Sequence, residues 1–143
     1  MSDGKELHVA AIVVTAAVVE RGGRFLVTRR QPGVHLEGYW EFPGGKCGGE
    51  ESLADCLRRE LREELAVDVQ VGDEILATTH TYADRRVELH FFRGDLLGEP
   101  APQMGQELRW VTREELAVLQ LPPADVELIR MLTAQTGSGT RKL

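Results

Sequence analysis

The sequence predicts an α+β fold in which helices cover a mixed β-sheet. Several apolar segments rich in β-branched residues are typical of buried strands, and segments of helical periodicity lie between them. The two kinds of segment do not alternate strictly, so helices packed over a mixed sheet are the natural arrangement. The chain has 143 residues, 42% hydrophobic and 28% charged, which fits one globular domain with its own core.

The first half of the chain is expected to begin with a β-hairpin. Residues 8–20 are apolar and β-branched, and the Arg-Gly-Gly turn at 21–23 leads into a second strand at 24–30. Residues 31–38 are expected to form a loop. The segment 39–45 then predicts a short strand that runs into a glycine-rich turn.

The second half is expected to contain helices and two longer strands. A helical segment at 51–65 precedes strand segments at 67–82 and 85–97. Thr112 and Glu115 have the spacing of a capping box, which predicts the start of a short helix. The remaining predicted elements are a loop at 98–106, a strand at 107–111, that short helix at 112–119 and a last helix at 121–135.

Charge and hydropathy exclude several functional classes. The net charge of −6 argues against a nucleic-acid polymer as partner, because a chain of phosphates favours basic protein faces. No segment approaches the ~20 apolar residues of a membrane span. The N-terminus is polar and acidic, so we expect neither a signal peptide nor a membrane partner, and a cytoplasmic location. We expect one domain over 1–143, with a core at about 8–134 and a disordered tail at about 137–143.

The two cysteines are expected to be free thiols. Cys47 lies in the glycine-rich loop and Cys56 in the helix that follows it. A disulfide between them would be expected to distort both the loop and the start of the helix. Free thiols also agree with a reducing cytosol.

A helix crowded with glutamates is the first sign of a functional site. Leucines that recur every four residues predict its buried face: Leu53, Leu57, Leu61 and Leu65. On a helical wheel Glu60 and Glu64 lie at the margin of this face, and Glu63 lies farther round the same margin. Like charges ~4 Å apart repel by about 4 kcal/mol at an effective dielectric constant near 20. A divalent cation would relieve this repulsion, and all-oxygen ligands favour Mg²⁺ or Mn²⁺ over Zn²⁺. The alternative is a solvated helix face neutralised by Arg59 and Arg62.

The glutamates stand at a fixed spacing from the glycine-rich loop. Gly45 is followed after five residues by Glu51, and after seven more by Arg-Glu-Leu-Arg-Glu-Glu-Leu-Ala-Val at 59–67. This spacing resembles the Nudix box, G-x5-E-x7-R-E-U-x-E-E-x-G-U, in which U is aliphatic. Ala66 departs from the pattern, which has glycine there, and we expect a slight change at the helix end. The resemblance covers about 13–132 and is to MutT-like Nudix hydrolases of the 8-oxo-dGTP diphosphatase and CTP pyrophosphohydrolase branch.

The resemblance implies a fold, an activity and a metal site. The fold would be a Nudix-type α/β/α sandwich with a mixed sheet. The activity would be cleavage of a nucleoside triphosphate to the monophosphate and pyrophosphate, with Mg²⁺, or Mn²⁺ in its place, as cofactor. By position, Glu60, Glu63 and Glu64 would bind the cation. The carbonyl of Gly44 would complete the site, and Arg59 would hold Glu60 by a charge-assisted hydrogen bond.

The residue that acts as catalytic base is left open by the sequence. Nudix hydrolases often have a glutamate in the loop before the 107–111 strand, where this chain has Met104 in "MGQ". Glu107 lies nearby and is the replacement that we expect. Glu60 and Glu63 are the alternatives.

The resemblance also implies side chains that contact the nucleotide. These are Arg30, His35, Phe42, Arg85 and Asp125, with Tyr82 and Asp84 in the same turn as Arg85. Each has a plain structural alternative: surface cations, a solvated loop residue, core packing or a helix N-terminal charge. Guanine-selective MutT proteins resemble "PPAN" where this chain has "PPAD", ending at Asp125. An ionised Asp only accepts hydrogen bonds, so oxidised guanine and cytosine nucleotides both stay open as substrates.

Three functions follow from these residues. The first is a Mg²⁺-dependent (deoxy)nucleoside triphosphate pyrophosphohydrolase that sanitises the nucleotide pool. Its candidate substrates are 8-oxo-dGTP, CTP, dCTP and modified cytosine nucleotides. The second is a Nudix hydrolase of another diphosphate-linked substrate, such as a nucleotide sugar, and the third is a non-catalytic nucleotide sensor. The chain is expected to be a monomer or a homodimer.

Overall fold

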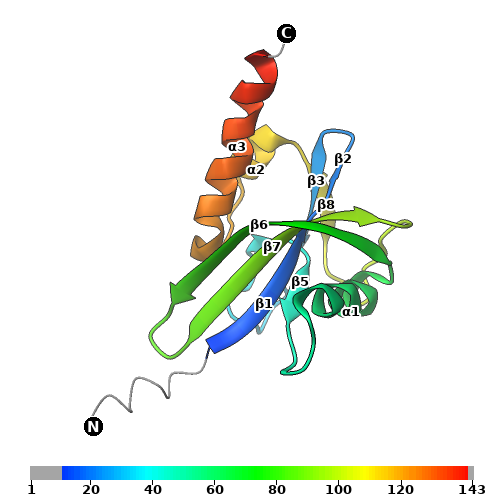
Figure 1. Cartoon of the computed structure of the whole chain (residues 1–143), viewed down its shortest axis with the longest axis vertical. Helices are drawn as coiled ribbons and strands as arrows, with labels where there is room; N and C mark the ends of the chain where they lie inside the picture. The colour runs from blue at the N-terminus through cyan, green and yellow to red at the C-terminus, as the bar shows by residue number, and fades with distance from the viewer. Residues whose placement is uncertain (1–10, 142–143) are drawn as a thin grey trace.

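A four-stranded mixed sheet forms the centre of the molecule, in the order β5-β1-β7-β6 (Figure 1). The computed structural model describes the backbone of residues 11–141 and the side chains of residues 11–134. β1 (Ala11–Val18) pairs in parallel with β7 (Arg86–Leu96). β6 (Val69–Thr81) forms an antiparallel hairpin with β7 at one edge, and β5 (Gly44–Lys46) pairs antiparallel with β1 at the other.

A second sheet stands beside the first. Its strands are β2 (Glu20–Arg21), β3 (Arg24–Arg29), β4 (Trp40–Glu41) and β8 (Leu108–Val111), with β3 paired to the other three. All the predicted strand regions are therefore present, although residues 8–10 lie outside the described part of the chain. The segment predicted as one short strand at 39–45 instead divides between the sheets, with β4 in the second and β5 in the first.

The division occurs at Pro43, whose ring removes a backbone donor. The Pro43 carbonyl accepts a hydrogen bond from the Ala17 amide of β1 at 2.8 Å, so the chain joins the first sheet directly after leaving the second. Gly44 then lies opposite Ala16, where a Cβ would fall 1.9 Å from the Thr15 carbonyl oxygen. Only glycine fits this approach of two backbones.

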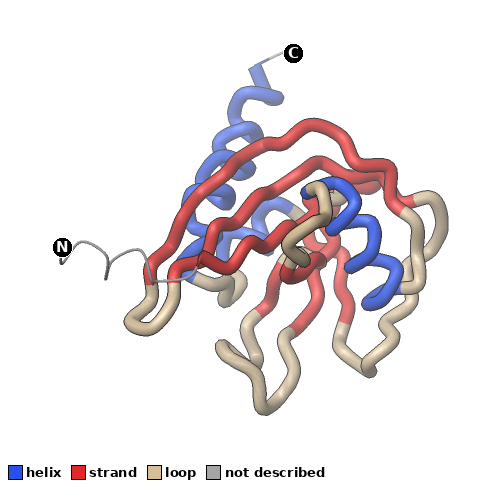
Figure 2. Tube along the Cα trace, turned by 60° about the horizontal axis from the view of Figure 1, so that its bottom comes forward, coloured by secondary structure: helices blue, strands red, loops and turns tan. Residues whose placement is uncertain are grey.

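Hydrophobic cores lie on both faces of the central sheet because successive side chains of a strand point to opposite faces. Ala16 and Val18 pack in a core with residues of α3 (Val126–Arg141) and α2 (Arg113–Val118). Ala17 and Val19 pack in the other core with three leucines of α1 (Leu53–Leu65). Figure 2 shows the sheet between α1 and the C-terminal helices. The predicted α+β fold, a sandwich with a mixed sheet, is confirmed.

The helices begin and end close to the predicted positions. Leu57, Leu61 and Leu65 are fully buried, as their four-residue spacing predicts. The capping box of α2 is present, with the Glu115 amide donating to the Thr112 hydroxyl at 3.1 Å. The predicted helix at 121–135 differs: a 3₁₀ turn, η2 (Pro123–Asp125), precedes α3 because two prolines stand at its start. The backbone of α3 remains helical through residues 137–141, in the segment predicted as a tail.

Within residues 11–141, no helix is long and apolar enough to cross a membrane.

Candidate active site

The loop between β5 and α1 is organised by hydrogen bonds from both of its ends. Ser52 caps α1, since its hydroxyl accepts a hydrogen bond from the Asp55 amide at 3.1 Å. The Glu51 carboxylate accepts one from the Gly48 amide at 2.9 Å. The Cys47 amide donates to the Val13 carbonyl of β1 at 2.9 Å, so the loop is also attached to the sheet. This loop presents its backbone to the first two turns of α1.

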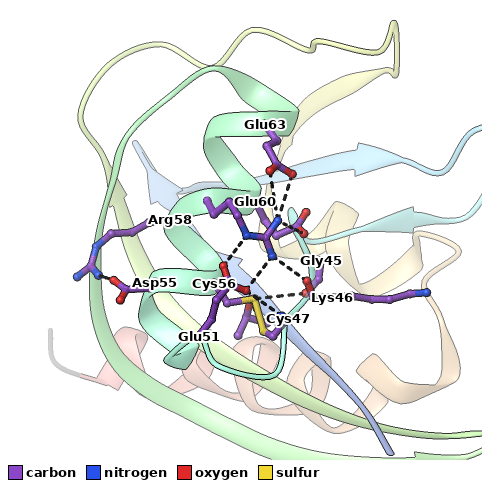
Figure 3. Close-up of polar contacts among 12 residues, drawn as sticks. Gly45, Lys46, Cys47, Glu51, Asp55, Cys56, Arg58, Glu60 and Glu63 are labelled. Carbon is purple, nitrogen blue, oxygen red and sulfur yellow. Dashed lines mark hydrogen bonds and ion pairs between the residues drawn. A yellow bond between two sulfur atoms is a disulfide. The ribbon is translucent and has the colours of Figure 1, made fainter.

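Arg59 is the centre of the charge network on α1, and its carboxylate partners Glu51, Glu60 and Glu63 are labelled in Figure 3. Its guanidinium donates to Glu51 Oε1 at 3.0 Å, to Glu60 Oε2 at 3.0 Å and to Glu63 Oε1 at 3.2 Å. It also donates to the Lys46 carbonyl at 3.0 Å, which ties the loop to the helix. The hydrogen bonds from Arg59 and from the Gly48 amide lower the pKa of Glu51 to about 2. The expected hydrogen bond between Arg59 and Glu60 is present, and Arg59 is shared with two further carboxylates.

The three glutamates of the motif differ in exposure. The side chain of Glu60 is 14% exposed and that of Glu63 is 59% exposed. Glu60 lies against Gly45 of β5, where a Cβ would fall 2.2 Å from Glu60 Oε1, so a larger residue at this position would displace the Glu60 carboxylate. Burial raises the pKa of Glu60 despite the opposing effect of Arg59. Glu64 has no arginine partner among the described residues: burial, with the charges of Glu41 and Glu60, raises its pKa to about 8, although a hydrogen bond from the Gly44 amide opposes the shift.

The oxygen atoms of these residues are suitable ligands for a divalent cation, although the residues do not surround a closed site. Among the described residues, no three His, Cys, Asp or Glu side chains are gathered closely enough to form a complete metal site. Glu60, Glu64 and Gly44 nevertheless line one cavity, and all of them offer oxygen ligands. The buried carboxyl of Glu64 is where a cation would relieve the largest electrostatic cost. Glu63 is not among the residues that line this cavity; its exposed carboxylate is hydrogen-bonded to Arg59.

The cavity that contains the glutamates has a volume of about 480 Å³ and extends across the central sheet to η2. At its far end Arg30 donates to Glu41 Oε1 at 2.8 Å and to the His35 carbonyl at 2.6 Å. Burial raises the pKa of Glu41, although Arg30 opposes the shift. The ring of His35 packs edge-on against Tyr82, with centroids 5.3 Å apart. This end of the cavity therefore combines aromatic rings with the Arg30–Glu41 ion pair.

Asp125 is the most deeply buried ionisable residue at that end. It is 4% exposed, and no ion pair or side-chain hydrogen bond is formed by its carboxyl with the described residues. Burial, followed by the charge of Glu41, raises the pKa of Asp125 to about 7. Burial and Asp125 together raise the pKa of Tyr82. A carboxyl in this setting is neutral in a large fraction of molecules near pH 7.

The structure places most of the predicted nucleotide-contacting residues around this cavity. Arg30, His35, Phe42, Arg85 and Asp125 all line it. Phe42 also belongs to the core, where it packs edge-on against Phe91. Glu107 does not line the cavity: it pairs with Arg29 at 2.8 Å beside a separate surface hollow. The candidate base is thus outside the cavity, whereas Glu60 is inside it.

Comparison with known proteins agrees with this geometry. The family model described as NUDIX domain matches residues 14–131. The chain belongs to the Nudix family. It is a Nudix hydrolase of the MutT-like kind, and the predicted resemblance is confirmed.

Three relatives of this Nudix hydrolase show the extent of the similarity. CTP pyrophosphohydrolase of Escherichia coli K12 is 36% identical over 124 residues, which are 86% of this chain and 92% of that protein. 8-oxo-dGTP diphosphatase of Proteus vulgaris is 36% identical over 92 residues, 64% of this chain and 79% of that protein. The solution structure of the E. coli ORF135 protein superposes with a TM-score of 0.80 at 34% identity, covering 91% of this chain and 94% of that one.

The prediction of two free cysteines is wrong. Cys47 and Cys56 form a disulfide in this Nudix hydrolase, with their Cα atoms 5.3 Å apart. That separation is ordinary for a disulfide, because the loop folds back over the first turn of α1. The expected distortion is absent: the Ser52 cap and the attachment of Cys47 to β1 are both intact.

Sequence reasoning also missed Glu41. It lies between Trp40 and Phe42, which are both buried, so the alternation of a strand places its carboxylate on the other side of the backbone. A charged residue enclosed by two aromatic core residues was the available signal. The carboxylate faces the cavity and influences both Glu64 and Asp125.

Proposed function

We propose that this Nudix hydrolase is a Mg²⁺-dependent nucleoside triphosphate pyrophosphohydrolase that prefers cytosine nucleotides and releases the monophosphate and pyrophosphate. One observation carries the proposal: a single cavity has oxygen ligands at one end and a buried, unpaired carboxyl at the other. The first suits a phosphate chain with its cation, and the second suits the edge of a base. The similarity to a CTP pyrophosphohydrolase supports the same choice.

At the phosphate end, Glu60, Glu64 and the Gly44 carbonyl would hold the cation, and the exposed Glu63 on the same helix would be a further ligand. A bound Mg²⁺, or Mn²⁺ in its place, would neutralise the phosphate chain and activate water for attack on phosphorus. Arg59 orients Glu60 for this role through its hydrogen bond. Of the candidate bases Glu60, Glu63 and Glu107, Glu60 is the one that lines the cavity, so it is favoured for accepting the proton of the attacking water, with Glu63 as the alternative.

At the base end, the protonation state of Asp125 decides which edge it can read. A neutral carboxyl has one donor and one acceptor, which match the ring nitrogen and amino group of cytosine. An ionised carboxylate has acceptors alone, which match the ring N–H and amino group of guanine or 8-oxoguanine. Since burial beside Glu41 keeps the pKa of Asp125 near 7, the cytosine match is favoured in neutral to acidic solution.

The test is a substrate panel measured at two pH values. The panel contains CTP, dCTP, 5-methyl-dCTP and 8-oxo-dGTP with Mg²⁺, together with a nucleotide sugar and a dinucleotide, and pyrophosphate release is the readout. We expect the ratio of kcat/KM for dCTP to that for 8-oxo-dGTP to fall about tenfold between pH 6 and pH 8.5. Asp125→Asn is the matched control, because an amide keeps donor and acceptor at both pH values and should make the ratio independent of pH.

Two results would contradict the proposal. Turnover confined to the nucleotide sugar or dinucleotide would favour the alternative diphosphate-linked substrates. Nucleotide binding without any turnover would leave this chain a sensor within a family of hydrolases. The single domain over 1–143, the cytoplasmic location, the role in sanitising the nucleotide pool and the choice between monomer and homodimer stay predictions.

A further inference from the structure

The Cys47–Cys56 disulfide joins the two segments that carry the proposed cation ligands. Cys47 stands three residues after Gly44, which lines the cavity. Cys56 stands one helical turn before Glu60, and residues at this spacing lie on one side of a helix. The sequence contains no further cysteine, so these two thiols can form one intramolecular disulfide and no other. The bond is therefore the covalent connection between the loop and the glutamate helix.

The remaining contacts between loop and helix are non-covalent and lie close to the surface. The Lys46 carbonyl accepts a hydrogen bond from Arg59, and Glu51 accepts from both Arg59 and the Gly48 amide. Lys46 and Gly48 are exposed, and such contacts exchange readily with water. Without the disulfide, the segment after the β5–β1 pairing, from Cys47 to Glu51, would depend on these contacts and on the hydrogen bond of the Cys47 amide to β1. The disulfide thus restricts the backbone next to the oxygen ligands.

The two sulfur atoms differ in their access to solvent. Cys56 is fully buried, and its Sγ lies 3.3 Å from the Thr15 hydroxyl inside the core. Cys47 is partly exposed at the surface of the loop. Cys47 Sγ also lies 3.8 Å from the Thr15 hydroxyl, but Cys47 is the more exposed of the two residues, so an external thiolate would approach from its side and Cys56 would be the sulfur that leaves.

We propose that this disulfide is a redox-sensitive clasp whose reduction weakens divalent-cation binding. The inference rests on the proposed cation site. A dithiol reductant attacks Cys47 Sγ, the bond between the two cysteines breaks, and Cys56 takes up a proton. The second thiol of the reductant then displaces Cys47, so the protein gains two electrons and two protons and the reductant becomes a disulfide. Disulfides of proteins in reducing compartments are usually transient or redox-sensing, which agrees with a reversible clasp.

The test compares cation affinity in three forms of the whole chain. These are the oxidised protein, the protein reduced with dithiothreitol and freed of it under nitrogen, and Cys47→Ser. Mn²⁺ binding is followed by the loss of the free-ion signal in electron paramagnetic resonance, and thiols are counted by alkylation and mass spectrometry. We expect about tenfold weaker Mn²⁺ binding in the reduced protein. Cys47→Ser should match the reduced protein and should not respond to dithiothreitol. Cys47 is the position to change because it is partly exposed, so the core remains filled.

The outcomes separate the clasp from the proposed function. Equal Mn²⁺ affinity in the oxidised and reduced proteins, with nucleotide turnover intact, would overturn the clasp alone. A disulfide that resists dithiothreitol in the folded protein would overturn it as well. Absence of Mn²⁺ binding and of turnover in every form, with near-ultraviolet circular dichroism unchanged, would overturn the cation site and the clasp with it. Restored affinity after reoxidation of the reduced protein would support reversibility.

Discussion

The two ends of the cavity use the same chemical group in opposite ways. At the phosphate end, Glu51, Glu60 and Glu63 share the guanidinium of Arg59, and hydrogen bonds keep the pKa of Glu51 at about 2. At the base end, Asp125 is buried without a cation, and its pKa rises to about 7. The nearby guanidinium of Arg30 is already hydrogen-bonded to Glu41. For Glu51 and Asp125, the presence or absence of a guanidinium partner among the described residues decides whether the carboxyl is charged or largely neutral; Glu64, buried at the phosphate end without an arginine partner, has a raised pKa like Asp125.

Glu64 is the residue whose change should break the phosphate end most severely. Glu64→Gln removes a charged oxygen ligand, and we expect kcat/KM for the best nucleotide to fall by about 10³-fold. The base end should be unaffected, so the affinity for the nucleoside monophosphate should stay within about twofold of the original. Pyrophosphate release and isothermal titration calorimetry measure the two quantities. Activity that survived in Glu64→Gln would show that the cation is held elsewhere.

The same variant should be more stable without cations. The pKa of Glu64 is raised to about 8 in the folded protein. Between the ordinary pKa of a glutamate and this value, the unfolded chain loses the proton while the folded protein keeps it, so a rise in pH disfavours folding. The amide removes this cost, on the order of 2 kcal/mol at pH 7 in EDTA. Urea unfolding at pH 4 and pH 7 measures it, and the gain should be absent at pH 4.

Arg59 tests whether the shared guanidinium keeps the phosphate end ordered. Arg59→Lys retains the charge but loses the planar fork that reaches three carboxylates and the Lys46 carbonyl. We expect kcat/KM to fall roughly 10- to 100-fold. The pKa of Glu51 should move back toward its usual range, which carbon-detected nuclear magnetic resonance titration would follow. An unchanged Glu51 titration would mean that the Gly48 amide alone stabilises the carboxylate.

Asp125 provides the corresponding test at the base end. The pKa of Asp125 is about 7 in the folded protein, above its value in the unfolded chain. The contribution of this carboxyl to the free energy of unfolding is therefore most favourable at low pH and is lost as the pH rises through about 7. Asp125→Asn should therefore stabilise the protein on the order of 2 kcal/mol at pH 8 and leave stability at pH 4 unchanged. Thermal unfolding at the two pH values is sufficient. Equal effects at both would show that the carboxyl is not neutral in the folded protein.

Ala66 lies outside both ends of the cavity, and its substitution is expected to have the smallest effect. It ends α1 in the left-handed conformation, with φ 52° and ψ 40°, and its amide donates to the Arg62 carbonyl at 3.1 Å. Ala66→Gly removes the cost of a Cβ in this conformation and should stabilise the protein by about 1 kcal/mol. Substrate preference and cation affinity should not change. A loss of stability would mean that the freedom of glycine in the unfolded chain outweighs the relief.

The local features of the fold were predictable because they depend on short-range spacing. The buried leucines of α1 follow its helical period, and the Thr112 cap depends on a residue three positions away. The margin position of Glu60 also follows from the wheel. The departure at Ala66 was recognised, and the helix does end there, in a conformation that favours glycine.

The long-range features were not predictable from one sequence. The neutral state of Asp125 depends on its burial and on Glu41, which is remote in the chain. The Cys47–Cys56 pair depends on the path of a loop that bends back over α1. The position of Glu107 depends on its pairing with Arg29 across the second sheet. In each case the deciding neighbour comes from another element, and no local pattern specifies it.

The passage of the chain through Pro43 has a consequence for substrate length. Glu41 and Gly44 are separated by two residues, yet one faces the base end and the other belongs to the phosphate end. Because β4 and β5 are paired to different sheets, both endpoints of this short bridge are anchored by backbone hydrogen bonds. The distance between the base end and the phosphate end of the cavity is thereby held nearly constant. A movement of one sheet relative to the other would change the fit of a mononucleotide at both ends at once.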